Sequence, residues 1–363
     1  MKRKIFVVLI LISCGLLSLA LRQPEKISRA GFSMNTLINM TLYAEDANNK
    51  ILDEAYDLLN KLDKELSMYD ASSDISKINS AAGVQSVKVP DDVIEVLKKS
   101  LQVYELSDGI FNPLIGAVTK LWKINEIEDS FIPSKVSLDA AIKLSEIQNL
   151  EIDENTSEVF LKTQGCILDL GGIAKGYASD KIIDLFKNNG IKSALIDLGG
   201  NIYALGKKPD GGYLAGDSDW NIGVRDPSKP YGNPALVLSV HDTSIITSGG
   251  YERFKIIDGK KYTHFFDFKT GEAIENDLLS ATLITPDGSL ADGLATAFMA
   301  SGYEKSVEIL KKIPSVGAVL IRLNDEELEI IATENLKENI SREKYPLKII
   351  RNEEVGTERT IRN

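Results

Sequence analysis

One short stretch of the chain places a carboxylate, two glycines and a lysine close together. Asp169 ends the apolar run 166–168, and the pair Gly171-Gly172 follows almost at once. Lys175 lies in the first turns of a helical pattern. Glycine has no Cβ, so a ligand can approach its backbone closely, and the start of a helix favours an anion. The stretch therefore predicts a seat for a phosphate group.

The same stretch has a simpler interpretation. Two glycines between a strand and a helix are often only a tight turn. The spacing matches neither the G-x-G-x-x-G dinucleotide fingerprint nor the P-loop pattern. Judged on these residues alone, a ligand seat and a plain turn both remain open.

A second candidate site lies in a strong helical pattern near the C-terminus. Asp292 and Thr296 are four residues apart, so their side chains project from one helix face. A carboxylate and a hydroxyl at this spacing suit a Mg²⁺ ion that keeps waters and also binds a substrate phosphate. The alternative is that Asp292 merely favours the start of the helix and Thr296 is an ordinary surface residue.

A third candidate is His264, one of only two histidines. It lies on a predicted strand, 263–268, that ends in a Lys-Thr-Gly turn, with Asp267 close by. The loop 248–253 is a second polar, glycine-bearing segment that could contact a ligand or simply join two strands. A lone histidine is more often structural than catalytic, so the residue type by itself does not decide.

Composition narrows the possible functions. The formal charge of −11 argues against a non-specific nucleic-acid binder. With two histidines and two cysteines, a metal site built from these residues is almost excluded, which leaves a hard cation on oxygen ligands. Cys166 lies in a predicted core strand and would have no disulfide partner after lipidation of Cys14.

The N-terminal segment, 1–22, is typical of an export signal or membrane anchor. A basic start, Lys2-Arg3-Lys4, precedes an almost wholly apolar run to Leu21. The sequence Leu11-Ile12-Ser13-Cys14 resembles a bacterial lipoprotein processing site, with Cys14 as the lipidated residue. Cleavage after Ala20 and an uncleaved anchor remain alternatives. We therefore expect a protein on the extracytoplasmic face of the bacterial cell membrane.

The remaining periodicities predict an α+β protein with a helix-rich and a strand-rich part that pack as one unit. We expect a short polar segment at residues 23–30 and a turn at residues 72–74. From residue 334 onward we expect a charged tail at the periphery of the protein. Helices are expected at 47–66, from Pro90 to Ser107, at 137–144, at 173–188 and on both sides of Gly302. Strands are expected at 34–43, 166–168, 194–198, 220–224, 235–240, 244–247, 254–257, 263–268, 280–285, 316–323 and 328–332.

Five ordered segments together resemble one family, the FAD:protein FMN transferases or ApbE family. Residues 169–178, DLGGIAKGYA, resemble its central signature, and residues 291–297 resemble its aspartate–alanine–threonine metal helix. The other three segments are 264–271, 66–79 and 109–113. The resemblance implies a single T-fold-like domain over 23–335, followed by a peripheral tail, 336–363. Three positions differ from the family pattern: Asn35 replaces a glycine, Asn112 an aspartate and Phe268 a proline.

The resemblance also implies site residues. FAD would be held by Met34, Tyr69, Ile110, Phe111, Asn112, Asp169, Lys175, His264, Phe265 and Phe266. Mg²⁺ would be held by Asp292, Thr296 and a carbonyl of the glycine turn, that of Gly172. The proton of the acceptor would pass to His264 or Asp292, and the sequence does not choose between these two residues.

The implied reaction cleaves the FAD pyrophosphate, releases AMP and attaches FMN to a Thr or Ser hydroxyl of another exported protein. Phosphoryl transfer depends mainly on positioning and charge neutralisation, which a magnesium ion and Lys175 would supply. Two alternatives remain: a Mg²⁺-dependent FAD pyrophosphatase that uses water as the acceptor, and a non-catalytic flavin-binding lipoprotein. The identity of the acceptor and the oligomeric state are beyond the sequence.

Overall fold

The computed structural model describes residues 24–44, 49–124, 131–209, 216–229 and 233–351, together with the backbone of 359–360. The export segment 1–22, including Cys14, lies outside the described residues. Among the helices that are described, none is long and apolar enough to cross a membrane.

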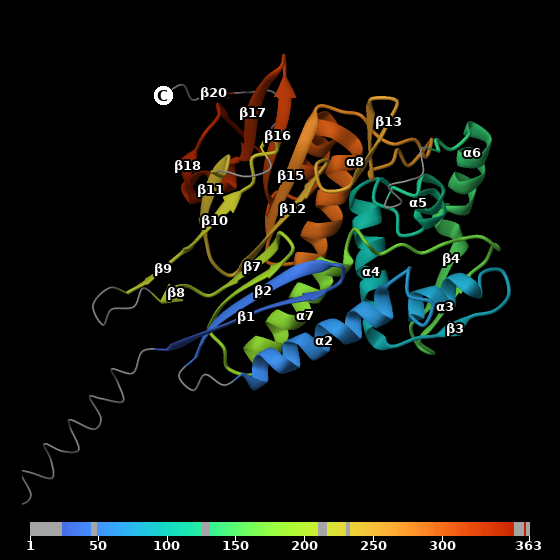
Figure 1. Ribbon diagram of the computed structural model, residues 1–363, viewed down its shortest axis with the longest axis horizontal. Coiled ribbons are helices and arrows are strands. Elements are labelled where there is room, and N and C mark those ends of the chain that lie inside the picture. The colour runs from blue at the N-terminus through green and yellow to red at the C-terminus, as the bar shows by residue number, and fades with distance from the viewer. Residues whose placement is uncertain are drawn as a thin grey trace, which may run out of the picture.

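A large, mixed sheet organises the molecule (Figure 1). Neighbouring strands in it are antiparallel except β17 and β19, which run parallel. In spatial order its strands are β1 (Glu25–Ser33), β2 (Thr36–Ala44), β6 (Ser193–Leu198), β7 (Asn201–Leu205), β12 (Thr243–Gly249), β15 (Leu278–Thr285), β16 (Gly317–Asn324), β17 (Glu327–Thr333), β19 (Leu347–Ile350) and β20 (Arg359–Thr360).

Helices pack on one face of this sheet and form the main core with it (Figure 1). Leucines and alanines at helical spacing fill the interface, for example Leu52, Leu59 and Leu62 of α2, all fully buried. These helices are α2 (Lys50–Leu66), α7 (Ala174–Asn188) and α8 (Gly288–Lys312); α8 changes direction at Gly302, where φ is 78°. The kink occurs where a helical pattern is interrupted by glycine, as the sequence predicts.

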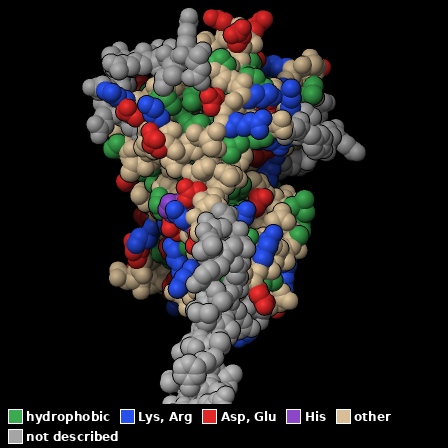
Figure 2. Space-filling model, turned by 90° about the vertical axis from the view of Figure 1, so that its left-hand side faces the viewer, with side chains coloured by type: hydrophobic (Ala, Val, Ile, Leu, Met, Phe, Trp, Pro, Cys, Tyr) green, Lys and Arg blue, Asp and Glu red, His purple; other side chains and the backbone are tan. Residues whose placement is uncertain are grey.

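A small three-stranded sheet covers the opposite face and closes a second core. Its strands are β10 (Trp220–Val224), β11 (Leu236–Val240) and β18 (Ile340–Glu343). Figure 2 shows the side of the molecule on which this sheet lies. Basic and acidic side chains are interspersed over the described part of that side, so neither sign gathers into a single patch.

The remaining elements form a helix-rich part beside the helical face of the large sheet (Figure 1). They are α3 (Asp74–Ser80), α4 (Asp91–Leu106), α5 (Gly116–Trp122), α6 (Lys135–Leu144), η1 (Ile147–Asn149) and the strands β3 (Val87–Lys88), β4 (Leu150–Asp153) and β5 (Glu158–Leu161). Short hairpins complete the fold: β8 (Lys208–Pro209) with β9 (Asp217–Ser218), and β13 (Phe254–Ile257) with β14 (Lys260–Thr263). A 3₁₀ turn, η2 (Glu334–Asn339), links β17 to β18.

Most of the predicted helices and strands are confirmed, and the differences have physical reasons. Cys166 and Leu168 are buried and Ile167 is partly buried, but residues 166–168 do not form a strand, since only one bridge, Ile115 with Ile167, pairs them. The predicted strand 263–268 is wrong except for its first residue, because the observed strand β14 ends at Thr263 and residues 264–268 lie in the bend and turn that follow it. Residues 72–74 lead into α3, whose first turn is capped by the Ser73 hydroxyl. Helix α6 begins at Lys135, two residues before the predicted start, because the Ser134 hydroxyl caps its first turn.

Both predicted peripheral ends are wrong. Residues 25–33 are the edge strand β1, whose polar residues reflect an edge position rather than a loop. Residues 340–343 and 347–350 belong to the two sheets, because β18 pairs with β11 and β19 pairs with β17. The buried Asp226 fixes this tail by accepting hydrogen bonds from Lys344 Nζ at 2.6 Å and Tyr345 Oη at 2.7 Å.

Candidate functional site

A large pocket opens between the helical core and the helix-rich part of the molecule. Its volume is about 790 Å³, within the range typical of small-molecule sites. Its walls come from the β1–β2 turn, the loop before α5, the starts of α7 and α8, the end of β12 and the segment after β14. Segments far apart in the sequence therefore meet at one cavity.

All site residues predicted from the sequence, apart from Cys14, line this pocket. The pocket brings together Met34, Tyr69, Ile110, Phe111, Asn112, Asp169, Gly172, Lys175, His264, Phe265, Phe266, Asp292 and Thr296. The predicted seat, the predicted metal residues and the predicted histidine thus form one site rather than three.

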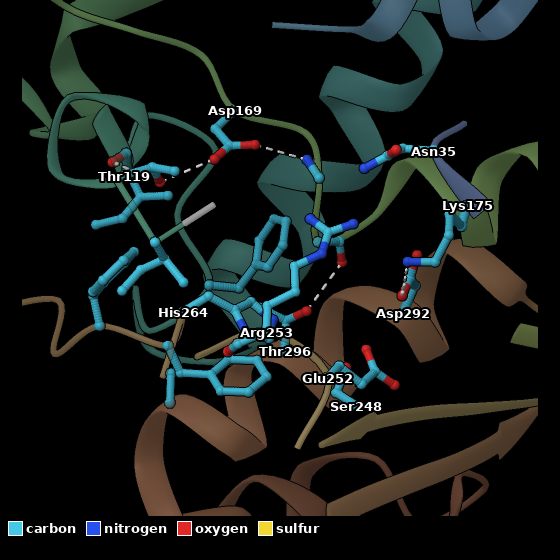
Figure 3. A pocket seen from close by; sticks show the side chains of 18 of the residues that line it. Asn35, Thr119, Asp169, Lys175, Ser248, Glu252, Arg253, His264, Asp292 and Thr296 are labelled. Atoms are coloured by element: carbon cyan, nitrogen blue, oxygen red, sulfur yellow. Dashed lines mark hydrogen bonds and ion pairs between the residues drawn. The ribbon is translucent and has the colours of Figure 1, made fainter. Parts of the chain in front are cut away.

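Asp292 and Thr296 meet the glycine turn at the helical wall of the pocket (Figure 3). Asp292 is only 2% exposed, and its Oδ2 accepts a hydrogen bond of 2.9 Å from the N–H of Gly176. Its other oxygen, Oδ1, lies 4.0 Å from Lys175 Nζ. One helical turn later, the Thr296 hydroxyl donates to the Gly172 carbonyl oxygen at 3.3 Å. A carboxylate, a hydroxyl and a carbonyl therefore converge here.

Limited space explains why a glycine is needed at one of the two positions of the turn. A Cβ on Gly172 would lie 2.9 Å from Thr296 Oγ1 and 3.2 Å from a ring carbon of Phe111. A Cβ on Gly171 would meet only Asp169 Oδ1, at 3.1 Å, because Gly171 is exposed. Neither glycine has a positive φ, so close approach rather than backbone strain requires glycine at Gly172.

The start of α7 offers fewer free N–H groups than the sequence predicts. The N–H groups of Ile173 and Ala174 both donate to the Leu170 carbonyl, and that of Gly176 donates to Asp292. The positive charge at this end of the pocket therefore comes from the Lys175 ammonium together with the helix dipole. This is a correction to the expected seat of free backbone donors.

Asp169 and Asn112 hold the turn and the loop before α5 in shape. Asp169 accepts hydrogen bonds from the Gly171 N–H at 2.9 Å and from the Thr119 hydroxyl at 3.0 Å (Figure 3). The Asn112 amide donates to the Ser145 carbonyl at 2.7 Å. Both side chains line the pocket while their polar atoms are engaged by the protein, so they shape the cavity even without a ligand.

The β1–β2 turn supplies Met34 and Asn35 at another edge of the pocket. Both residues have positive φ, 49° and 56°, the left-handed pair that a two-residue hairpin turn requires. Asparagine tolerates this conformation, so it serves here in place of the family's glycine. Tyr69 lies at the mouth of the pocket with 68% of its surface exposed.

His264 lies across the pocket from Lys175 and Asp292 (Figure 3). Its Nδ1 lies 3.0 Å from the Arg253 carbonyl oxygen. Because a carbonyl can only accept, Nδ1 carries the hydrogen and Nε2 is left as an acceptor. Burial lowers the pKa of His264 to about 4, with smaller contributions from the cations Arg253 and Lys175 and against the opposing effect of the hydrogen bond to the Arg253 carbonyl. The imidazole is therefore neutral at pH 7.

The turn after His264 owes its shape to Asp267. Its carboxylate accepts hydrogen bonds from the N–H groups of Lys269 and Thr270, both at 2.8 Å. The Gly271 carbonyl then accepts a 2.7 Å hydrogen bond from the Trp122 indole of α5. Phe268 takes the place of the family's proline without disturbing this turn, because these contacts leave its side chain uninvolved.

Sequence reasoning missed most of the positive charge around the pocket. Five cationic side chains line it, against three carboxylates: Lys120, Lys123, Lys175, Arg225 and Arg253 against Asp169, Glu252 and Asp292. In a chain of net charge −11, this local excess of two positive charges favours an anionic ligand. Lys120 lies in the last turn of α5 and Lys123 directly follows this helix, and the short spacing between the two lysines in the sequence was the available signal.

Comparison with known proteins defines the family. The chain belongs to the ApbE family, whose model matches residues 34–320. A Treponema pallidum protein named "FAD:protein FMN transferase" is 37% identical over 325 residues, which cover 86% of this chain and 90% of that protein. A protein of the same name from Klebsiella pneumoniae is 31% identical over 294 residues, 80% of this chain and 87% of its own length.

Solved structures agree on the fold. The crystal structure of Pseudomonas stutzeri flavinyl transferase ApbE, in its apo form, superposes with a TM-score of 0.78 at 27% identity. The match covers 89% of this chain and 99% of that one. The mixed α/β fold expected from the sequence is therefore confirmed.

Proposed function

We propose that this protein transfers FMN from FAD to a hydroxyl group of a protein side chain and releases AMP. The observation that carries the proposal is the convergence of Asp292, Thr296 and the Gly172 carbonyl beside Lys175, in a pocket lined by an excess of cations. Family membership supports it, since the relatives named above are FAD:protein FMN transferases.

The oxygen groups at the helical wall fit a magnesium ion. Thr296 Oγ1 and the Gly172 carbonyl oxygen are 3.3 Å apart, close to the roughly 3 Å expected between neighbouring ligands that each lie about 2.1 Å from Mg²⁺. The described residues contain no cluster of three or more His, Cys, Asp or Glu side chains that could hold a metal. A resident ion would thus rely on one carboxylate, neutral oxygens and substrate phosphate. When bound there, Mg²⁺ would neutralise charge on the pyrophosphate.

The chain's own residues would position and neutralise the substrate. Lys175, one-quarter exposed, directs its ammonium toward the space beside Asp292, where it can bind a phosphate oxygen. Phe111, Phe265 and Phe266 are nearly buried around the pocket and offer apolar surface to a flavin ring. Charge neutralisation and in-line positioning are what phosphoryl transfer chiefly requires.

His264 is the better of the two candidates for the group that accepts the proton of the acceptor hydroxyl. Its Nε2 is an acceptor because Nδ1 donates to Arg253, and its lowered pKa keeps it neutral. Asp292 is less suited, since one of its oxygens is fixed to Gly176 and the other faces Lys175. His264 would therefore act as the general base.

The acceptor would be a Thr or Ser of an exported protein, and this protein would be anchored outside the membrane through lipidated Cys14. Support for the location is the basic and apolar N-terminal sequence alone. If it holds, Cys14→Ser should release the protein from membranes or leave its precursor unprocessed. Unchanged attachment and processing would instead indicate an uncleaved anchor.

The proposed reaction can be tested directly. Purified protein would be incubated with FAD, Mg²⁺ and a candidate exported acceptor, and the acceptor would be analysed by mass spectrometry. An adduct with the mass of FMN on a Thr or Ser, absent with Asp292→Ala, supports the transferase. FMN and AMP in solution without an adduct would indicate a pyrophosphatase, and intact FAD would indicate a binding protein.

A further inference from the structure

The helices α7 and α8 cap each other's first turns. The first N–H groups of a helix lack partners within the helix. In α7, the Gly176 N–H donates to Asp292 of α8 at 2.9 Å. In α8, the N–H groups of Gly288 and Ser289 donate to Asp180 of α7 at 2.7 and 2.9 Å. The Ser289 hydroxyl adds a third bond to Asp180, at 2.6 Å.

Two glycines bring the helices close enough for this exchange. A Cβ on Gly176 would overlap the carbonyl oxygen of Gly288. A Cβ on Gly288 would lie 2.7 Å from both Asp180 Oδ1 and Ser179 Oγ. Because backbone meets backbone here, neither helix can slide along or rotate about the other without breaking a cap. We call Asp180, Gly176, Gly288, Ser289 and Asp292 the helix clasp.

The helix clasp ends inside the pocket. Asp292 lies one turn beyond Gly288, and Lys175 directly precedes Gly176. Since Asp292 Oδ2 is fixed by the Gly176 N–H, its Oδ1 is held toward Lys175 and the pocket (Figure 3). A side chain that coordinates a metal typically binds it less tightly when it loses the hydrogen bonds that orient it. The orientation of Asp292 thus depends on where α8 begins, a position that Asp180 fixes together with Asp287, the N-cap residue that accepts the Leu290 N–H at 2.9 Å.

We propose that Asp180 is a positioning residue: by capping α8 it sets the direction of the Asp292 carboxylate and so the affinity of the site for Mg²⁺. Asp180 does not line the pocket, and its carboxylate accepts its hydrogen bonds from Gly288 and Ser289. This inference rests on the proposed magnesium site.

The test compares Mg²⁺ affinity across a series of variants by calorimetric titration of Mg²⁺ into the folded protein. Asp180→Ala removes all three bonds, and about tenfold weaker Mg²⁺ binding is expected, the lower end of what loss of an outer partner causes. Asp180→Asn keeps one oxygen acceptor and should fall between Asp180→Ala and wild type. Asp184→Asn, on the exposed side of the same helix one turn later, is the matched control and should bind as wild type.

A purely structural role predicts a different pattern. In that case Asp180→Ala lowers the melting temperature but binds Mg²⁺ like wild type, and this result would overturn the inference. FAD affinity measured without Mg²⁺ should stay unchanged, which separates an effect on the metal site from a distorted pocket. If Asp180→Ala does not fold, Asp180→Asn and Ser289→Ala provide the same comparison. If the wild-type protein itself binds no Mg²⁺, the proposed metal site fails, and this inference fails with it.

Discussion

The helical wall of the pocket is packed much more tightly than the open wall formed by the β1–β2 turn and Tyr69. On the helical side Asp292 is 2% exposed, and helices meet backbone to backbone at Gly176 and Gly288. On the open side Tyr69, which lines the pocket, is 68% exposed. Rigid, buried groups can hold charges in fixed positions, whereas an open wall admits a large partner. The comparison matches a proposed transferase that fixes one substrate and receives a protein as the other.

The largest expected effect comes from the tight wall. Asp292→Ala removes the only carboxylate of the proposed metal set and leaves the buried Gly176 N–H without its acceptor. FAD turnover should fall by at least about 10²–10³-fold, the usual result of losing a group that stabilises developing charge. The free energy of unfolding should fall by about 1–3 kcal/mol. Asp292→Asn keeps an acceptor for Gly176, so it should lose turnover but not stability. Normal turnover in both variants would refute the metal site.

Gly172→Val should come next. Its Cβ would press on Thr296 Oγ1 and Phe111, and overpacking of this kind costs about 1–3 kcal/mol. Turnover should be lost because the hydroxyl and the carbonyl no longer meet. Gly171→Ala is the matched control, since its Cβ meets only Asp169 Oδ1. Melting temperatures and turnover for the pair test whether the tight fit lies at Gly172; equal losses in both variants would show that it does not.

His264→Gln probes the wall that lies across the pocket from Lys175 through its pH dependence. Loss of a general base typically lowers the rate by about 10²-fold or more. The folded-state pKa of His264 is lowered to about 4, whereas an unfolded histidine titrates near pH 6.5. Between these values the unfolded chain binds more protons, so stability should fall as the pH drops from about 6.5 to about 4. Because His264→Gln has no imidazole at this position, it should not show this part of the loss of stability at low pH.

The control for the histidine is His241→Gln. His241 is exposed, and its Nδ1 contacts Asp219 on another part of the surface. Denaturant titrations between pH 4 and 7 would compare both variants with wild type. An identical pH dependence in His264→Gln and wild type would contradict the neutral, enclosed histidine.

The smallest expected effect is that of Lys175→Ala. A hydrogen bond from the ammonium to a phosphate oxygen contributes about 1.5–3 kcal/mol. FAD should therefore bind roughly 10- to 150-fold more weakly, with little change in melting temperature. Lys187→Ala, in the last turn of the same helix, is the control. Unchanged FAD affinity in Lys175→Ala would show that Lys175 does not bind the phosphate of FAD and only pairs with Asp292.

Local sequence was sufficient wherever neighbouring residues alone set the structure. The helix of α2 follows from leucines at helical spacing, and the break in α8 follows from Gly302. The i, i+4 spacing of Asp292 and Thr296 placed both on one helix face, and every described residue that motif resemblance predicted for the site lines the pocket. These inferences involve short-range geometry, which a chain carries in its own order of residues.

Tertiary structure decided what depends on distant partners. Residues 166–168 are apolar enough for a strand, but they pack beside Ile115 outside the large sheet. The polar residues at 25–33 and 340–350 did not predict strands in the sequence. They nevertheless form strands of the two sheets, because β2, β11 and β17 each have an unpaired edge with which they can pair. The cations from Lys120 to Arg253 gather only when α5 and the β12–β13 loop meet, and the caps exchanged by Asp180 and Asp292 join residues more than a hundred positions apart. Such contacts arise from packing, which no local pattern encodes.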